Sequence, residues 1–233
     1  TRAGWGIVVK RIPEHIMSLL PIFALFFIPI LFGLDHIYEW LDPEKIANDY
    51  LIQKKLPYLN LSFFIIRNIF YFVTFSVISI FYWKNSINQD KLTKQKDIEN
   101  TTKKLQRNAP VAVLLLSLAT SFAAFDWLMS LEPHWFSTMF GVYTFANSVV
   151  AALCTTTLLY LILRSYGYLK EVVTIEHYHD LGKLLYGFII FWTYISFSQF
   201  FLIWYANIPE ETEWYAHHME GSWGTVGFFI IFG

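Results

Sequence analysis

Residues 61–83, LSFFIIRNIFYFVTFSVISIFYW, decide the fold, because this run is apolar over nearly its whole length and contains a single charged residue, Arg67. A helix of roughly 20 apolar residues crosses a bilayer core about 30 Å thick, and this run is long enough. Four more apolar runs of comparable length follow or precede it: Ile16–Leu34, Val111–Leu131, Phe136–Leu163 and Leu181–Tyr205. The sequence therefore predicts an all-α, polytopic transmembrane helical bundle with five full spans.

The composition agrees with a membrane protein. Hydrophobic residues make up 55% of the chain, charged residues 15%, and the mean hydropathy is +0.42. A soluble domain of this size would rarely combine so much apolar surface with so little charge. The formal net charge of −1 gives no reason to expect nucleic acid as a partner.

The basic residues are distributed unevenly between the two sides. If the runs alternate in direction, thirteen Lys and Arg residues lie on one side, and Lys45, Lys54 and Lys55 are the ones on the other. The positive-inside rule then makes the basic side cytoplasmic. Residues 84–109 are predicted to be a cytoplasmic charged loop or helical hairpin, and residues 35–60 an outer-side interfacial segment.

We expect residues 1–233 to form one transmembrane helical domain, the interior part of a longer protein. A sixth apolar run begins at Trp223 but stops too soon to cross.

In the outer segment, Asp42 and Pro43 predict a capped helix with proline in its first turn. Ser148 and Ala152 predict a close helix contact.

Several cofactor sites are disfavoured by the residues available. Iron–sulfur clusters use several thiolates, whereas the chain has one cysteine, Cys154, and its histidines lie at span ends rather than in pairs within spans. We therefore predict no haem, iron–sulfur cluster or metal bound by this chain. The cluster His177-Tyr178-His179-Asp180 could hold a metal in principle, but a helix N-cap at Asp180 is the favoured interpretation.

Two charges lie where a membrane disfavours them. Arg67 and Asp126 both fall in the outer half of their spans, and such charges normally face the bundle interior with a partner. The sequence therefore predicts that they pair. Asn60, Arg67 and Tyr71 follow one stripe of the second span. A face of small residues surrounds the acid on the third span, formed by Ala119, Ala123, Asp126 and Ser130.

Further polar residues at similar depth leave two interpretations open. Tyr143, Asn147 and Gln199 are expected in the same layer of the bundle as Asp126. The layer is either a structural ion-pair network that fixes helix register or a proton path or quinone-headgroup pocket. In the functional interpretation, Asp126 accepts a proton and Arg67 shifts the pKa of Asp126. Tyr143, Asn147 or Gln199 then orients the headgroup.

The chain resembles a known family in two segments. DWLMSLEPHWFST at 126–138, with GVY at 141–143, resembles the membrane subunits of bacterial alternative complex III, a quinol:cytochrome c oxidoreductase. HDLGKLL at 179–185 and FLIWYANIPEET at 201–212 resemble the same subunits, and the F subunit more than the larger C subunit. These are similar to polysulfide reductase and NrfD-type membrane subunits, which are helical bundles without cofactors of their own.

The resemblance implies a setting for the chain. It implies a bacterial cytoplasmic membrane and a respiratory complex with a C-type membrane subunit, an iron–sulfur protein and c-type cytochromes, to which a terminal oxidase is a further candidate partner. Haem c and iron–sulfur clusters would then belong to partner subunits, the substrate would be menaquinol or ubiquinol, and lipids would surround the spans.

Four more residues are candidates for a proton route. Glu132 and His134 would pass protons to the outer surface, although they equally suit a turn and an interface anchor. Asp180 and Lys183 would form a cytoplasmic mouth, or simply cap the fifth span.

One alternative class is a standalone transporter or channel, which predicts broken helices and inverted repeats; Pro21 and Pro29 could break the first span, but the sequence shows no internal repeat. The other is a purely structural membrane anchor.

Overall fold

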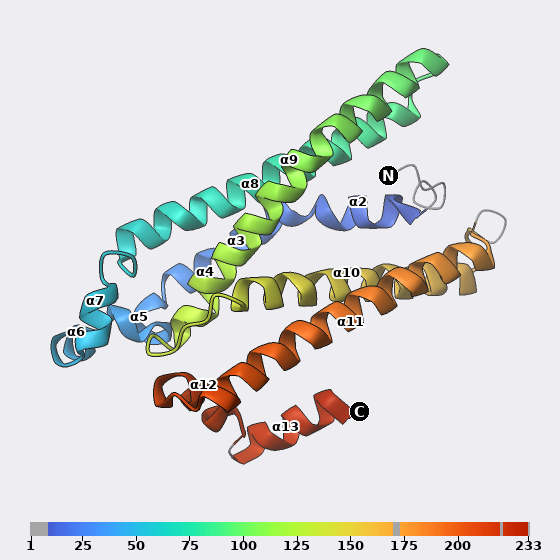
Figure 1. Cartoon of the computed structure of the whole chain (residues 1–233). Helices are drawn as coiled ribbons and strands as arrows, with labels where there is room; N and C mark the ends of the chain where they lie inside the picture. Colours follow the sequence, from blue (N-terminus) through green and yellow to red (C-terminus); the bar gives the residue numbers. More distant parts are fainter. Residues whose placement is uncertain (1–8, 170–172, 220, 233) are drawn as a thin grey trace.

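The computed structural model describes residues 9–169, 173–219 and 221–232, and in these ranges it is all-helical (Figure 1). Four long helices carry the bundle: α8 (Leu61–Asp90), α9 (Gln95–Trp127), α10 (Phe140–Ser165) and α11 (Ile175–Ala206). The shorter helices are α2 (Arg11–Met17), α3 (Leu20–Phe26), α4 (Ile28–Leu31), α5 (Leu34–Ile37), α6 (Pro43–Asn48), α7 (Tyr50–Lys55), α12 (Pro209–Met219) and α13 (Gly221–Phe232), with 3₁₀ turns at Glu39–Leu41 and Met129–Leu131.

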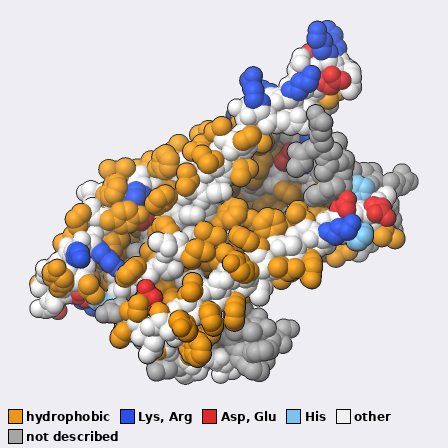
Figure 2. All heavy atoms as spheres, in the orientation of Figure 1, with side chains coloured by type: hydrophobic (Ala, Val, Ile, Leu, Met, Phe, Trp, Pro, Cys, Tyr) orange, Lys and Arg blue, Asp and Glu red, His pale blue; other side chains and the backbone are white. Residues whose placement is uncertain are grey.

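Among the described residues, five helical segments are long and apolar enough to cross a membrane, as expected for a multi-pass helical bundle. They are Arg11–Leu31, Leu61–Asp90, Gln95–Leu131, Phe140–Ser165 and Ile175–Ala206. The long helices pack in chain order, α8 against α9, α9 against α10 and α10 against α11. Apolar side chains cover much of the visible surface of these helices, as a lipid environment requires (Figure 2).

The first span is interrupted, whereas its apolar run predicted one helix over Ile16–Leu34. It consists of α2, α3 and α4, with Pro21 and Pro29 in the first turns of α3 and α4. Proline has no backbone N–H to continue the preceding helix but suits the first turn of a new one.

Pro110 lies inside a continuous helix. The apolar run of the third span begins at Val111, and α9 already runs from Gln95 through Pro110. The turn at residues 91–94 joins α8 to α9, so residues 84–109 form a helical hairpin. Gln89 Nε2 donates to Thr102 Oγ1 at 2.7 Å, and Lys104 Nζ donates to Asn85 Oδ1 at 3.1 Å across it.

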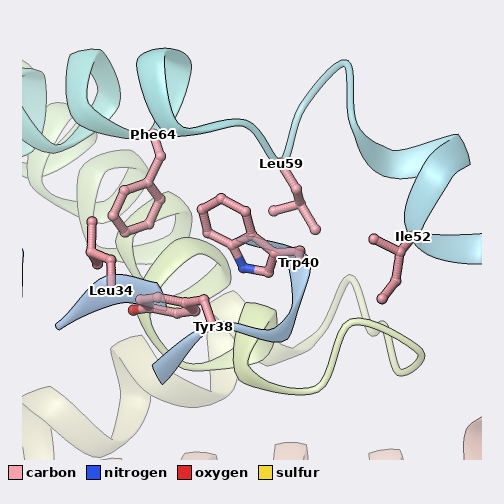
Figure 3. Packing of buried hydrophobic residues seen from close by; sticks show 6 residues of the cluster. All are labelled: Leu34, Tyr38, Trp40, Ile52, Leu59 and Phe64. Atoms are coloured by element: carbon pink, nitrogen blue, oxygen red, sulfur yellow. The ribbon is translucent and has the colours of Figure 1, made fainter. Parts of the chain in front are cut away.

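Residues 34–59 fold into a compact cap over one end of the bundle. The predicted helix cap is confirmed, because Asp42 Oδ1 accepts from the Glu44 amide at 2.9 Å and Pro43 begins α6. Trp40, fully buried, packs at the centre of a cluster with Leu34, Tyr38, Ile52, Leu59 and Phe64 (Figure 3). We call this end of the bundle, with residues 34–60 and 128–139, the α7 end.

The predicted N-cap at Asp180 is wrong. Helix α11 begins at Ile175, and Thr174 caps it in a capping box with His177. Asp180 therefore lies inside the helix, because the polar first turns of α11 precede the apolar run used to predict its start.

The close contact between α9 and α10 lies at Gly141 rather than at Ser148 and Ala152, which are exposed. A Cβ atom at Gly141 would lie 2.8 Å from Ser121 Cβ and 3.1 Å from the Phe125 ring. Glycine therefore permits the approach of these two helices.

Candidate functional site: the buried ion pair between α8 and α9

Arg67 on α8 and Asp126 on α9 form a bidentate ion pair. Arg67 Nε lies 2.7 Å from Asp126 Oδ2, and Nη2 lies 2.9 Å from Oδ1. Asp126 is completely buried and Arg67 is 8% exposed. The two intramembrane charges that the sequence singled out are therefore brought together, in the geometry that gives Arg–carboxylate pairs their strength.

The remaining polar atoms of the pair are also engaged. The Tyr71 hydroxyl donates to Asp126 Oδ2 at 2.7 Å, and Arg67 Nη1 donates to the Tyr58 carbonyl at 2.9 Å. The guanidinium carbon lies 3.9 Å from the centre of the Tyr58 ring and 4.3 Å from that of Phe63. Aromatic faces favour a cation at this distance. The pair is thus enclosed, and each of its charges is hydrogen-bonded.

Helical spacing explains how the chain builds this arrangement. Arg67 and Tyr71 are four residues apart and share one face of α8. On α9, Ala119 and Ala123 are small enough to let Tyr71 pack against them, which fits the close helix approach predicted for this face. Asn60 does not belong to the stripe, because its side chain accepts from the Phe63 amide at 2.9 Å and caps the start of α8.

Residues next to the pair tie the same two helices together. Trp127 Nε1 donates to Asn68 Oδ1 at 2.5 Å, again from α9 to α8. Ser130 Oγ donates to the Asp126 carbonyl at 2.5 Å and closes the end of α9. The site is therefore a continuous polar contact between the two helices.

The other predicted headgroup contacts lie elsewhere. Tyr143 packs its ring against Phe140 and Trp192, Asn147 is exposed on α10, and Gln199 is buried on α11. Within the described ranges, no hydrogen bond joins any of these three side chains to Asp126 or Arg67. Of the five proposed headgroup residues, the hydrogen bonds of the described ranges join Arg67 to Asp126.

His134 and Glu132 lie in the loop after α9. His134 Nε2 hydrogen-bonds Asp49 Oδ2, and Lys55 Nζ donates to the Pro133 carbonyl, so both contacts bind this loop to α7. The hydrogen bond from His134 holds the pKa of Asp49 below its ordinary value. Glu132 is half-buried and lines a cavity of about 210 Å³ together with His134.

Asp180 and Lys183 lie far from the ion pair, near the start of α11 at the other end of the bundle (Figure 1). Lys183 Nζ is 3.7 Å from Asp180 Oδ1, one turn along the helix. Lys183 is exposed, so this contact contributes little to stability.

A second polar cluster was not anticipated from the sequence. Arg11 Nη2 lies 2.6 Å from both carboxylate oxygens of Asp90, and Ser86 Oγ donates to Glu14 Oε2 at 2.6 Å. These contacts bind α2 to the far end of α8, which we call the α2 end. The sequence feature that could have indicated this cluster is the four-residue spacing of Ser86 and Asp90, which places both side chains on one face of the helix.

Within the described residues, no group of three or more His, Cys, Asp or Glu side chains is placed to hold a metal ion. His177 Nδ1 is used in the cap of α11, where the Thr174 amide donates to it at 3.2 Å. The ion pair itself can fix helix register, and it could exchange a proton only if one of its hydrogen bonds opened.

Comparison with known proteins adds no family: no family model matches this chain, and no curated protein matches it.

Proposed function

We propose that this chain is an integral membrane subunit of a quinol:cytochrome c oxidoreductase complex, in which it contributes assembly and holds no redox centre of its own. The five spans and the resemblance of residues 126–138 support this proposal. Under it, menaquinol or ubiquinol is oxidised in the complex, and the haem and iron–sulfur centres belong to partner subunits on one side of the membrane.

The observation that carries the assembly role is the full engagement of Asp126. Both of its carboxylate oxygens already accept hydrogen bonds, from Arg67 and Tyr71. A quinol hydroxyl would have to displace one of these donors, so the geometry favours a positioning role for Asp126 over direct contact with the headgroup. The segment 126–138 also contacts the start of α7, because His134 hydrogen-bonds Asp49, and this is a second contact that holds the segment in place.

The first test is the reduced-minus-oxidised visible spectrum of the full-length protein, purified gently from its native membrane with its companions. We expect c-type haem absorption bands from partner subunits. A featureless spectrum from an intact, stable preparation would overturn the proposal.

The second test separates assembly from proton transfer. In the native complex, Asp126→Asn should lower the yield of assembled complex while leaving turnover per assembled complex unchanged. The double variant Arg67→Met, Asp126→Leu should recover part of the yield, because apolar residues of similar size can replace a buried pair. Full assembly with reduced turnover would instead assign Asp126 to a proton path.

A transporter is the second candidate, and one observation favours it. The first span consists of three short helices that meet at Ser18–Leu19 and at Phe27, just before Pro21 and Pro29, and discontinuous helices often form transporter binding sites. A stable preparation without haem bands would move this candidate to the front.

A further inference from the structure

A cavity of about 360 Å³ opens at the α7 end, between α7 and the loop that follows α9. Much of its wall is apolar and includes Leu59, Phe125, Met129 and Phe136. Its charged lining residues are Lys54 and Lys55, and no Asp or Glu is among the described residues that line it. A largely apolar cavity of this size with a few polar groups is typical of a small-ligand site.

Lys55 is a cation that the protein does not neutralise within this cavity. Its Nζ donates to the Pro133 carbonyl and lies 5.3 Å from the centre of the Phe136 ring. Burial lowers the pKa of Lys55, and the charge of Asp49 opposes that shift only partly. Among the residues that line the cavity, the groups that contact this ammonium are a neutral carbonyl and a ring face, which leaves room for an incoming anion.

Trp135 and Lys54 also line this cavity. Trp135 is 3% exposed, and its indole N–H has no hydrogen-bond partner within the described ranges. The indole nitrogen itself is closed to solvent, so Trp135 contributes its ring to the wall of the cavity. Lys54, exposed beside Lys55, supplies a second positive charge.

An apolar track leads away from the cavity along α9. The ring of Phe125, which lines the cavity, lies 5.9 Å from that of Phe122. Phe122, Leu118 and Leu114 follow at four-residue spacing and are 45%, 50% and 61% exposed. They therefore form one lipid-facing row that runs from the cavity toward the middle of the span.

We propose that this cavity binds the headgroup of an anionic phospholipid, with its phosphate beside Lys54 and Lys55 and an acyl chain along the Phe122 row of α9. A phosphate offers a negative charge, which the described residues that line the cavity lack. A neutral ring would leave the lysines uncompensated, and a choline headgroup would bring a second cation toward them. The proposal is independent of quinol oxidation, since it uses none of the atoms of the ion pair.

The test is native mass spectrometry of the delipidated full-length protein, titrated with dioleoyl phosphatidylglycerol or dioleoyl phosphatidylcholine. We expect preferential retention of phosphatidylglycerol. Lys54→Gln should weaken that retention about fivefold, the usual effect of one lysine on binding to anionic lipid. Lys54→Arg should bind like the wild type, as should the matched control Lys103→Gln, which removes an exposed charge from the other end of α9.

Three outcomes would overturn the proposal. The first is equal retention of the two lipids by the wild type, a result that needs no variant. The second is unchanged retention by a folded Lys54→Gln protein. The third is displacement of phosphatidylglycerol by inorganic phosphate at the same concentration, because this would assign the cavity to a free anion.

Discussion

The two ends of α8 are both held by arginine–carboxylate pairs, but the pairs differ in their surroundings. At the α7 end, the side chain of Asp126 is fully buried, and that of Arg67 is 9% exposed. At the α2 end, the side chains of Arg11 and Asp90 are 32% and 58% exposed. The two pairs have similar N···O distances, but their contributions to stability differ, because solvent screens the pair of Arg11 and Asp90 and does not reach that of Arg67 and Asp126.

The largest effect is expected from breaking the buried pair. Asp126→Ala should lower the free energy of unfolding by about 3–5 kcal/mol, because it leaves a guanidinium enclosed without its anion. Chemical denaturation in mixed micelles measures this change. A loss below about 1 kcal/mol would show that the buried pair behaves like an exposed one.

The second effect tests the hydrogen bond from Tyr71. Tyr71→Phe keeps the ring against Ala119 and Ala123 and removes the hydroxyl that donates to Asp126. We expect a loss of about 1.5–3 kcal/mol, the usual contribution of a hydrogen bond to a charged group. In the Asp126→Ala background the same change should have little effect, and an undiminished effect there would contradict the assigned contact.

At the α2 end the expected change is smaller. Asp90→Asn should cost at most about 1 kcal/mol, and the cost should shrink further as salt is added. Denaturation in low and high salt checks this expectation. A cost that equals that of Asp126→Ala would remove the distinction between the two ends.

The smallest effect concerns the link between Asp49 and His134. Because the folded-state pKa of Asp49 is lowered from its ordinary value of 3.8, its contribution is present above that value and is lost as the pH falls through the folded-state pKa. Asp49→Asn should therefore be slightly less stable than the wild type at neutral pH, and the two should converge below about pH 4. Thermal unfolding across this range measures the difference, and a constant gap at all pH values would contradict it.

The spans and the buried pair could be predicted from sequence for one physical reason. A membrane imposes a length on apolar runs and a high cost on an isolated charge, so Arg67 and Asp126 each required a partner. The surroundings of the pair could not be predicted in the same way. The contribution of Tyr58 depends on the path of residues 56–60, and the contact of His134 joins residues 85 positions apart.

Helix boundaries were predicted less well, because an apolar run marks the part of a helix that lies in the bilayer and not the residues at which the helix begins and ends. Pro110 lies within α9, and the first turns of α11 are polar, so both helices begin well before their apolar runs. Tyr143, Asn147 and Gln199 were grouped by depth alone. Depth does not determine which face of a helix a side chain occupies, and within the described ranges none of the three is hydrogen-bonded to Asp126.

The separation of Arg67 and Asp126 along the chain has a consequence for biosynthesis. The arginine precedes its partner by 59 residues, so α8 is synthesised before the carboxylate exists. An arginine at the centre of a membrane helix costs roughly 2.5–3.5 kcal/mol on insertion scales, and Arg67, in the outer half of its span, costs less than this. The helical hairpin of α8 and α9 is therefore best inserted as one unit, with the charged pair formed at the translocon before either helix enters the lipid.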